Sequence, residues 1–86
     1  MNKNELISII KNKLEENISF EDLKIEDKSF LHKNHLGNEK GKYHFKLLIK
    51  SKELKNLSKI NSSKKIYQIL DEEMNLHIHS LQILIS

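Results

Sequence analysis

The stretch KYHFKLLIK, residues 42–50, decides the fold of this 86-residue sequence. Apolar and polar side chains alternate along it, as they do in a strand that buries one face and exposes the other. The pattern therefore predicts a β-strand whose inner face carries four residues, namely Tyr43, Phe45, Leu47 and Ile49. His44 falls on the outer face of this strand, and we interpret it as an exposed residue of the sheet surface.

Two further elements are predicted upstream of this strand. Apolar residues at helical spacing indicate a helix over about residues 4–16, introduced by the capping-box pattern Asn2-x-x-Glu5. A half-buried strand follows over about residues 22–28. The polar segment 27–41 holds both glycines of the chain and is predicted to be a loop.

Downstream, a short helical turn is predicted over about residues 53–57, followed by a longer helix that Ser58 caps and that reaches about Met74. The acidic run at residues 71–73 then falls in the last turn of that helix, where the helix dipole disfavours negative charge. The chain ends with LHIHSLQILIS, residues 76–86, which we interpret as a closing strand.

The predicted order of elements is α-β-β-α-α-β, which is an α+β fold. The first two strands form an antiparallel hairpin, and the last strand returns by a helical crossover to lie parallel to one of them. We therefore expect a three-stranded mixed sheet with the helices on one face. The length of the chain predicts a single domain over residues 1–86.

Composition limits the classes of function. The chain has no cysteine, which excludes disulfides and any metal site built from its own thiolates. The absence of cysteine, of an apolar run of about 18 residues and of a signal peptide at the N-terminus predicts a cytoplasmic protein without membrane contact. We find no motif for a nucleophile, a P-loop or a dinucleotide turn, so we expect no enzymatic activity.

Histidines are the residues most suggestive of function. Strand alternation puts His77 and His79 on the same face as Leu81, Ile83 and Ile85, so His79 is expected at the rim of the core face among apolar neighbours. His77 and His79 form a possible ligand pair, and His32 and His35 of the loop form another; together they suggest a zinc site as one alternative. Solvated or hydrogen-bonded histidines are the simpler interpretation of both pairs.

Lysines give a second lead. The net charge is only +3, but Lys59, Lys64 and Lys65 lie near the predicted start of the long helix, where a helix N-terminus can bind phosphate. These lysines are candidate nucleic-acid contacts, and a solvated lysine-rich surface is the simpler interpretation.

Several of these pieces together resemble the BolA family over nearly the whole chain. The most specific are Tyr43-His44-Phe45-Lys46 and Ile78-His79-Ser80-Leu81, where the family usually has Ala in place of Ser80. The other matching pieces are Asp27-x-Ser29, His35, Leu57-Ser58 and Ile66-Tyr67-x-x-Leu70. The usual Arg-His-Arg at the start of the long helix reads Ser62-Ser63-Lys64 here, which weakens the case for nucleic-acid contact.

The resemblance implies a fold similar to a class II KH domain and a partner, a monothiol glutaredoxin with a Cys-Gly-Phe-Ser motif. The two proteins would share a 2Fe–2S cluster, with thiolates from the glutaredoxin and from glutathione and with imidazoles from His79 and His35. The isolated chain, a monomer or weak homodimer, would hold no cluster. An imidazole ligand removes negative charge from such a cluster and raises its potential.

Two functions therefore compete. The first is a partner of a glutaredoxin in iron–sulfur cluster assembly, trafficking or iron regulation. The alternative is a DNA-binding transcriptional regulator that uses the KH-like fold.

Overall fold

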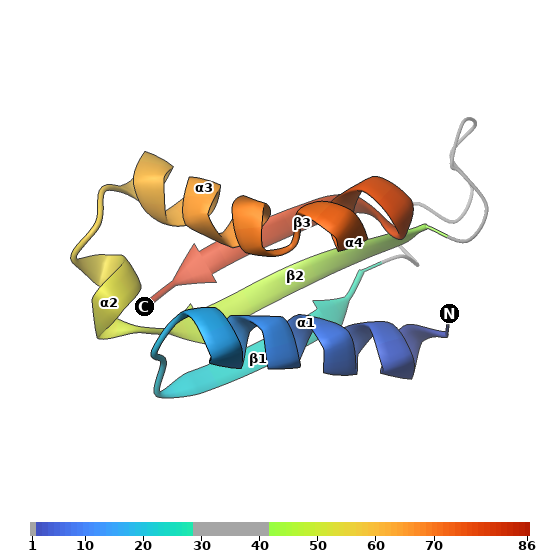
Figure 1. Ribbon diagram of the computed structural model, residues 1–86, viewed down its shortest axis with the longest axis horizontal. Coiled ribbons are helices and arrows are strands. Elements are labelled where there is room, and N and C mark those ends of the chain that lie inside the picture. The colour runs from blue at the N-terminus through green and yellow to red at the C-terminus, as the bar shows by residue number, and fades with distance from the viewer. Residues whose placement is uncertain (1, 29–41) are drawn as a thin grey trace.

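The computed structural model describes residues 2–28 and 42–86, which form a three-stranded sheet with helices packed against it (Figure 1). In chain order the elements are α1 (Lys3–Asn17), β1 (Asp22–Asp27), β2 (Tyr43–Lys50), α2 (Lys52–Lys55), α3 (Lys59–Ile69), α4 (Asp71–Leu76) and β3 (Ile78–Ile85). No helix within these residues is long and apolar enough to cross a membrane.

The central strand is β2, and the strand order is β1-β2-β3. β1 pairs with β2 antiparallel, from Asp22 opposite Lys50 to Asp27 opposite Phe45. β3 pairs with β2 parallel along its other edge, because the chain returns through α2, α3 and α4 before β3 begins. The predicted mixed sheet, its antiparallel hairpin and its parallel crossover are all confirmed.

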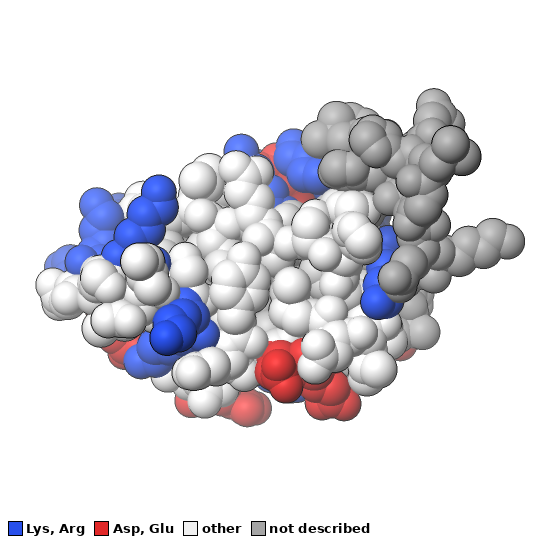
Figure 2. All heavy atoms as spheres, turned by 90° about the horizontal axis from the view of Figure 1, so that it is seen from above, with Lys and Arg blue, Asp and Glu red and all other residues white. Residues whose placement is uncertain are grey.

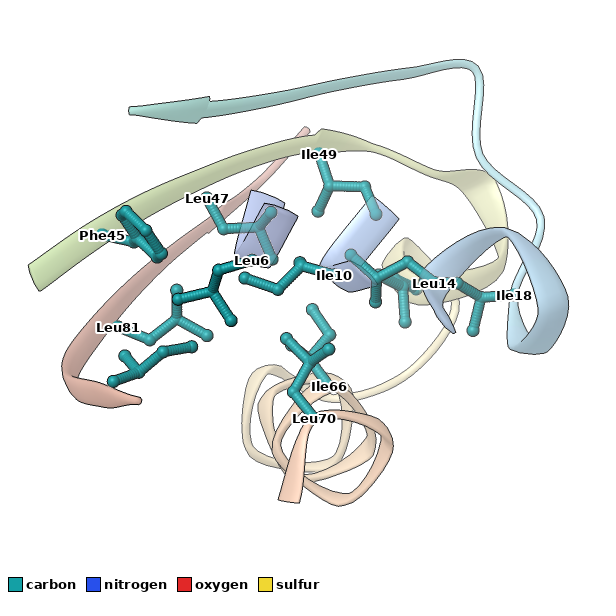
Figure 3. Packing of buried hydrophobic residues seen from close by; sticks show 12 residues of the cluster. Leu6, Ile10, Leu14, Ile18, Phe45, Leu47, Ile49, Ile66, Leu70 and Leu81 are labelled. Atoms are coloured by element: carbon teal, nitrogen blue, oxygen red, sulfur yellow. The ribbon is translucent and has the colours of Figure 1, made fainter. Parts of the chain in front are cut away.

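The hydrophobic core lies between the sheet and the helices (Figure 3). Leu6, Ile10 and Leu14 recur at a spacing of four residues, so they form one stripe of α1 that faces the core. Phe45, Leu47 and Ile49 cover the same core from β2, as their alternation predicted. Ile66 of α3, Leu70 at the junction of α3 and α4, and Leu81 of β3 enclose the core from the other side.

Side-chain caps begin three of the helices. Asn2 Oδ1 accepts from the backbone N–H of Glu5 at 2.8 Å while Asn2 Nδ2 donates to Glu5 Oε1 at 2.9 Å, so the predicted capping box is confirmed. Ser58 caps α3 as predicted, by accepting from the N–H of Asn61. Ser51 caps α2 and is fully buried, and its hydroxyl also donates to the carbonyl of Ser19 at 2.7 Å.

The long helix expected to reach Met74 is interrupted at Leu70, whose φ of −101° and ψ of 20° lie outside the helical range. This break changes the electrostatics of the acidic run. Asp71, Glu72 and Glu73 lie in the first turn of a new helix rather than the last turn of an old one, so the helix dipole favours them. The expectation of an unfavourable position was wrong, because sequence periodicity did not reveal the break.

Glu73 is buried and forms the main polar contact between α1 and α4. Lys13 Nζ donates to Glu73 Oε2 at 2.6 Å, and this hydrogen bond is the largest cause of a raised pKa for Lys13. Glu73 Oε1 is buried without a hydrogen-bond partner among residues 2–28 and 42–86. Lys13 is therefore the main compensation for a carboxylate that burial would otherwise destabilise.

Replacing Lys13 tests this dependence. We expect Lys13→Met to lower the free energy of unfolding at pH 7 by about 1–2 kcal/mol, because it leaves the Glu73 carboxylate buried and uncompensated. Urea denaturation measures the change. Lys11→Met, at an exposed lysine of the same helix, is the matched control and is expected to change stability by less than about 0.5 kcal/mol. Equal losses for the two variants would contradict the role given to Lys13.

Candidate functional site

The start of β3 contains one extra residue, His79. Tyr43 pairs with Ile78 but the next residue of β2, His44, pairs with Ser80, so His79 has no partner in the register. This irregularity is a β-bulge, a feature that is frequent at sheet edges and beside functional sites. His79 lies on β3, an edge strand of the sheet, and its side chain is exposed.

The bulge corrects two expectations about the closing strand. Ile78, not His79, reaches the core at this end, and both Ile78 and Leu81 are buried despite their odd spacing. His77 lies outside the strand altogether, as the C-cap residue of α4. The prediction that His77, His79 and Leu81 share one face was wrong because it assumed unbroken alternation, and His79 does not lie among apolar core neighbours.

His44 is the second imidazole of the site, and sequence reasoning misjudged it. His44 belongs to the outward face of β2 and precedes the core residue Phe45, but its exposed fraction is only 6%. Its Nδ1 lies 2.7 Å from Ser80 Oγ, in a hydrogen bond whose direction depends on the tautomer. The rings of His44 and His79 are 4.9 Å apart between centroids and tilted by 53°. The site thus consists of His79, His44 and Ser80.

The loop histidines His32 and His35 lie outside the described residues, so their predicted roles as ligands stay predictions. Within the ranges 2–28 and 42–86, no group of three or more His, Cys, Asp or Glu side chains is arranged to hold a metal ion. The described part of the site therefore offers imidazole nitrogens but not a full ligand set.

The predicted lysines lie at the opposite end of β3. Lysine side chains gather at the end of the molecule that holds α2 and the start of α3 (Figure 2). There, Lys55 and Lys59 line a hollow of about 400 Å³ whose other walls include Leu57 and the last residues of β3. Lys59 and Lys64 are exposed.

Lys65 differs from the other two predicted lysines because it has an acidic partner. Its Nζ donates to Glu53 Oε2 at 3.0 Å. This hydrogen bond is the largest cause of a pKa for Glu53 below its ordinary value. Much of the charge of Lys65 is therefore already balanced within the chain.

Comparisons with known proteins agree with this architecture. The family model described as BolA-like protein matches residues 14–86. The DNA-binding transcriptional regulator BolA of Haemophilus influenzae is 39% identical over 75 residues, which cover 87% of this chain and 70% of that protein. The predicted resemblance is thereby confirmed.

Solved structures give the same result for the fold. The BolA domain of SufE1 from Arabidopsis thaliana superimposes with a TM-score of 0.77 at 28% identity, covering 100% of this chain and 93% of that one. BolA1 from Arabidopsis thaliana gives a TM-score of 0.76 at 26% identity, covering 93% and 88%.

Deleting His79 tests whether it is an extra residue in the strand. Without it, Ile78 would adjoin Ser80 and alternation would run unbroken to Leu81, so we expect a loss of unfolding free energy below about 1 kcal/mol. Deleting Gln82, an exposed residue of the same strand, is the control. That deletion turns the partly buried Ile83 and Ile85 away from the core and is expected to cost roughly 2 kcal/mol or more. Similar thermal unfolding midpoints for the two deletions would contradict the bulge.

Proposed function

This chain belongs to the BolA-like protein family, and we propose that it acts as a binding partner of a monothiol glutaredoxin. In this proposal the two proteins share a 2Fe–2S cluster, in iron–sulfur cluster assembly, trafficking or iron regulation. The chain works by binding and supplying ligands, not as an enzyme. The observation that supports the proposal is the exposed imidazole of His79, which lies at a bulge in the edge strand β3.

The chemistry of the available donors fits a shared cluster. A chain without cysteine has only imidazoles and carboxylates to offer to iron, so the thiolates have to come from elsewhere. His79 is accessible to a second protein because β3 is an edge strand. When bound, such a cluster supplies electron-transfer chemistry whose potential an imidazole ligand raises.

Two further contributors belong to the proposal. His35 is proposed as a second ligand from the segment between β1 and β2, and it lies outside the described residues. Glutathione bound by the glutaredoxin is proposed as the source of one thiolate. Within residues 2–28 and 42–86 no group of three His, Cys, Asp or Glu side chains is arranged to hold a metal ion, so the proposal takes the remaining ligands from the partner.

A reconstitution experiment tests the proposal. The chain is mixed with a monothiol glutaredoxin, iron, sulfide and glutathione, and visible absorption and circular dichroism are recorded. We expect a spectrum distinct from that of the glutaredoxin alone, because an imidazole replaces a thiolate at iron. His79→Ala is expected to abolish that difference.

His77→Ala is the matched control, because His77 is two residues away but lies outside β3. It is expected to give the wild-type spectrum. A wild-type mixture with the spectrum of the glutaredoxin alone would rule the proposal out. Loss of the difference in both variants would argue against a specific role for His79.

A second candidate function is DNA binding. The Haemophilus influenzae relative carries that function in its name. In this chain Lys59 lines the hollow, and both Lys59 and Lys64 are exposed on α3. Phosphate contacts by such lysines would give binding that weakens steeply with salt. Lys65 is the weakest contributor to this proposal because Glu53 balances its charge.

Fluorescence anisotropy with duplex DNA over a range of salt concentrations tests the second candidate. Binding is expected to lose affinity with a slope of about −0.9 for each phosphate contact in a plot of log affinity against log salt. The double variant Lys59→Gln/Lys64→Gln is expected to reduce the slope by about two contacts. Lys11→Gln, on the exposed side of α1, serves as the control. No binding at low salt would exclude this function.

A further inference from the structure

We propose that Ser80 and His44 act as positioning residues that hold the imidazole of His79 in one orientation. The purpose of that orientation rests on the function proposed above, but the positioning itself is a property of the isolated chain. It follows from two contacts beside the bulge, the ring contact between His44 and His79 and the hydrogen bond between His44 and Ser80.

The bulge creates the need for positioning. His79 has no partner in the register of β2 and β3, and its side chain is exposed at an edge strand. An imidazole in such a place rotates about two side-chain bonds, and ordering it on binding costs conformational entropy. Any contact that limits this rotation beforehand reduces that cost.

His44 supplies a fixed surface for the ring. Its exposed fraction of 6% means that it is enclosed by its surroundings, in contrast to His79. The separation of 4.9 Å between the two ring centroids and the tilt of 53° lie in the range where aromatic rings pack favourably. The buried ring of His44 therefore restricts the rotation of the exposed ring of His79.

Ser80 in turn fixes His44. Its Oγ lies 2.7 Å from Nδ1 and, because a hydroxyl can either donate or accept, this contact restrains the orientation of the His44 ring in either tautomer. A hydrogen bond to the second ring nitrogen is the usual way in which proteins orient a ligating histidine. Here the hydrogen bond is made to the ring of His44, which contacts His79, and not to His79 itself.

The bulge accounts for the contact between Ser80 and His44. Because His79 is the extra residue, Ser80 rather than His79 becomes the cross-strand partner of His44. Partners in a parallel pair point to the same face, so the hydroxyl and the imidazole meet. A regular strand would have aligned His44 with His79, so the hydrogen bond between His44 and Ser80 depends on the bulge.

Nuclear magnetic resonance of the isolated chain tests the positioning directly. Long-range proton–nitrogen spectra of the imidazoles are recorded at about pH 8, above the ordinary histidine pKa. In the wild type we expect the ring protons of His79 to be shifted by the neighbouring ring of His44. In Ser80→Ala we expect the His79 ring signals to move close to those of an unstructured histidine.

Ser80→Thr is the matched rescue, because threonine keeps the hydroxyl and suits a strand. It is expected to give the wild-type imidazole signals. Backbone amide spectra identify any variant that has lost its fold. Unchanged His79 ring signals in a folded Ser80→Ala variant would overturn the proposal.

The cluster-loaded mixture with a glutaredoxin gives the second readout. Loss of an outer contact to a metal-binding histidine typically weakens affinity by about 10–100-fold, so we expect Ser80→Ala to bind the cluster about 10-fold more weakly, with Ser80→Thr near the wild type. Equal retention in the alanine variant and the wild type would count against positioning. Should the wild type itself load no cluster, the proposed function fails, while the resonance experiment still decides the positioning.

Discussion

The register between β2 and β3 is the constraint on which the rest of the structure depends. Ile78 follows directly after α4 and its C-cap residue, and it has to be buried to close the core at that end. Leu81 has to be buried as well, and strand alternation cannot bring both residues to one face across an odd interval. One extra residue resolves the conflict, and His79 is that residue.

The two proposed functions use opposite ends of the same strand. The histidines lie at the start of β3, whereas the lysine-lined hollow lies against its last residues. Leu84 follows His79 by five positions, which at about 3.3 Å per residue corresponds to roughly 16 Å. The two candidate sites are therefore distinct surfaces at the two ends of β3.

The chemistry of the candidate site was only partly predictable from the sequence. His79 was identified because a histidine beside an apolar strand is unusual, and the motif around it resembles a known family. Its support was not identified, because His44 alternates with core residues and that pattern by itself predicts exposure. The signal that was available is the neighbouring Ser80, but its meaning depends on which residue of β2 it pairs with.

The sequence by itself determined the types and order of the elements, the core residues of α1 and β2, the capping of α1 and α3, and the family. These features depend on local periodicity and on side chains a few residues apart, so short stretches of the sequence are enough to predict them. Only the tertiary structure decided the break at Leu70, the pairing of Lys13 with Glu73, and the bulge that joins His79, His44 and Ser80. The physical reason is that each of these depends on contacts between segments distant in the chain, where burial and strand register override the local pattern.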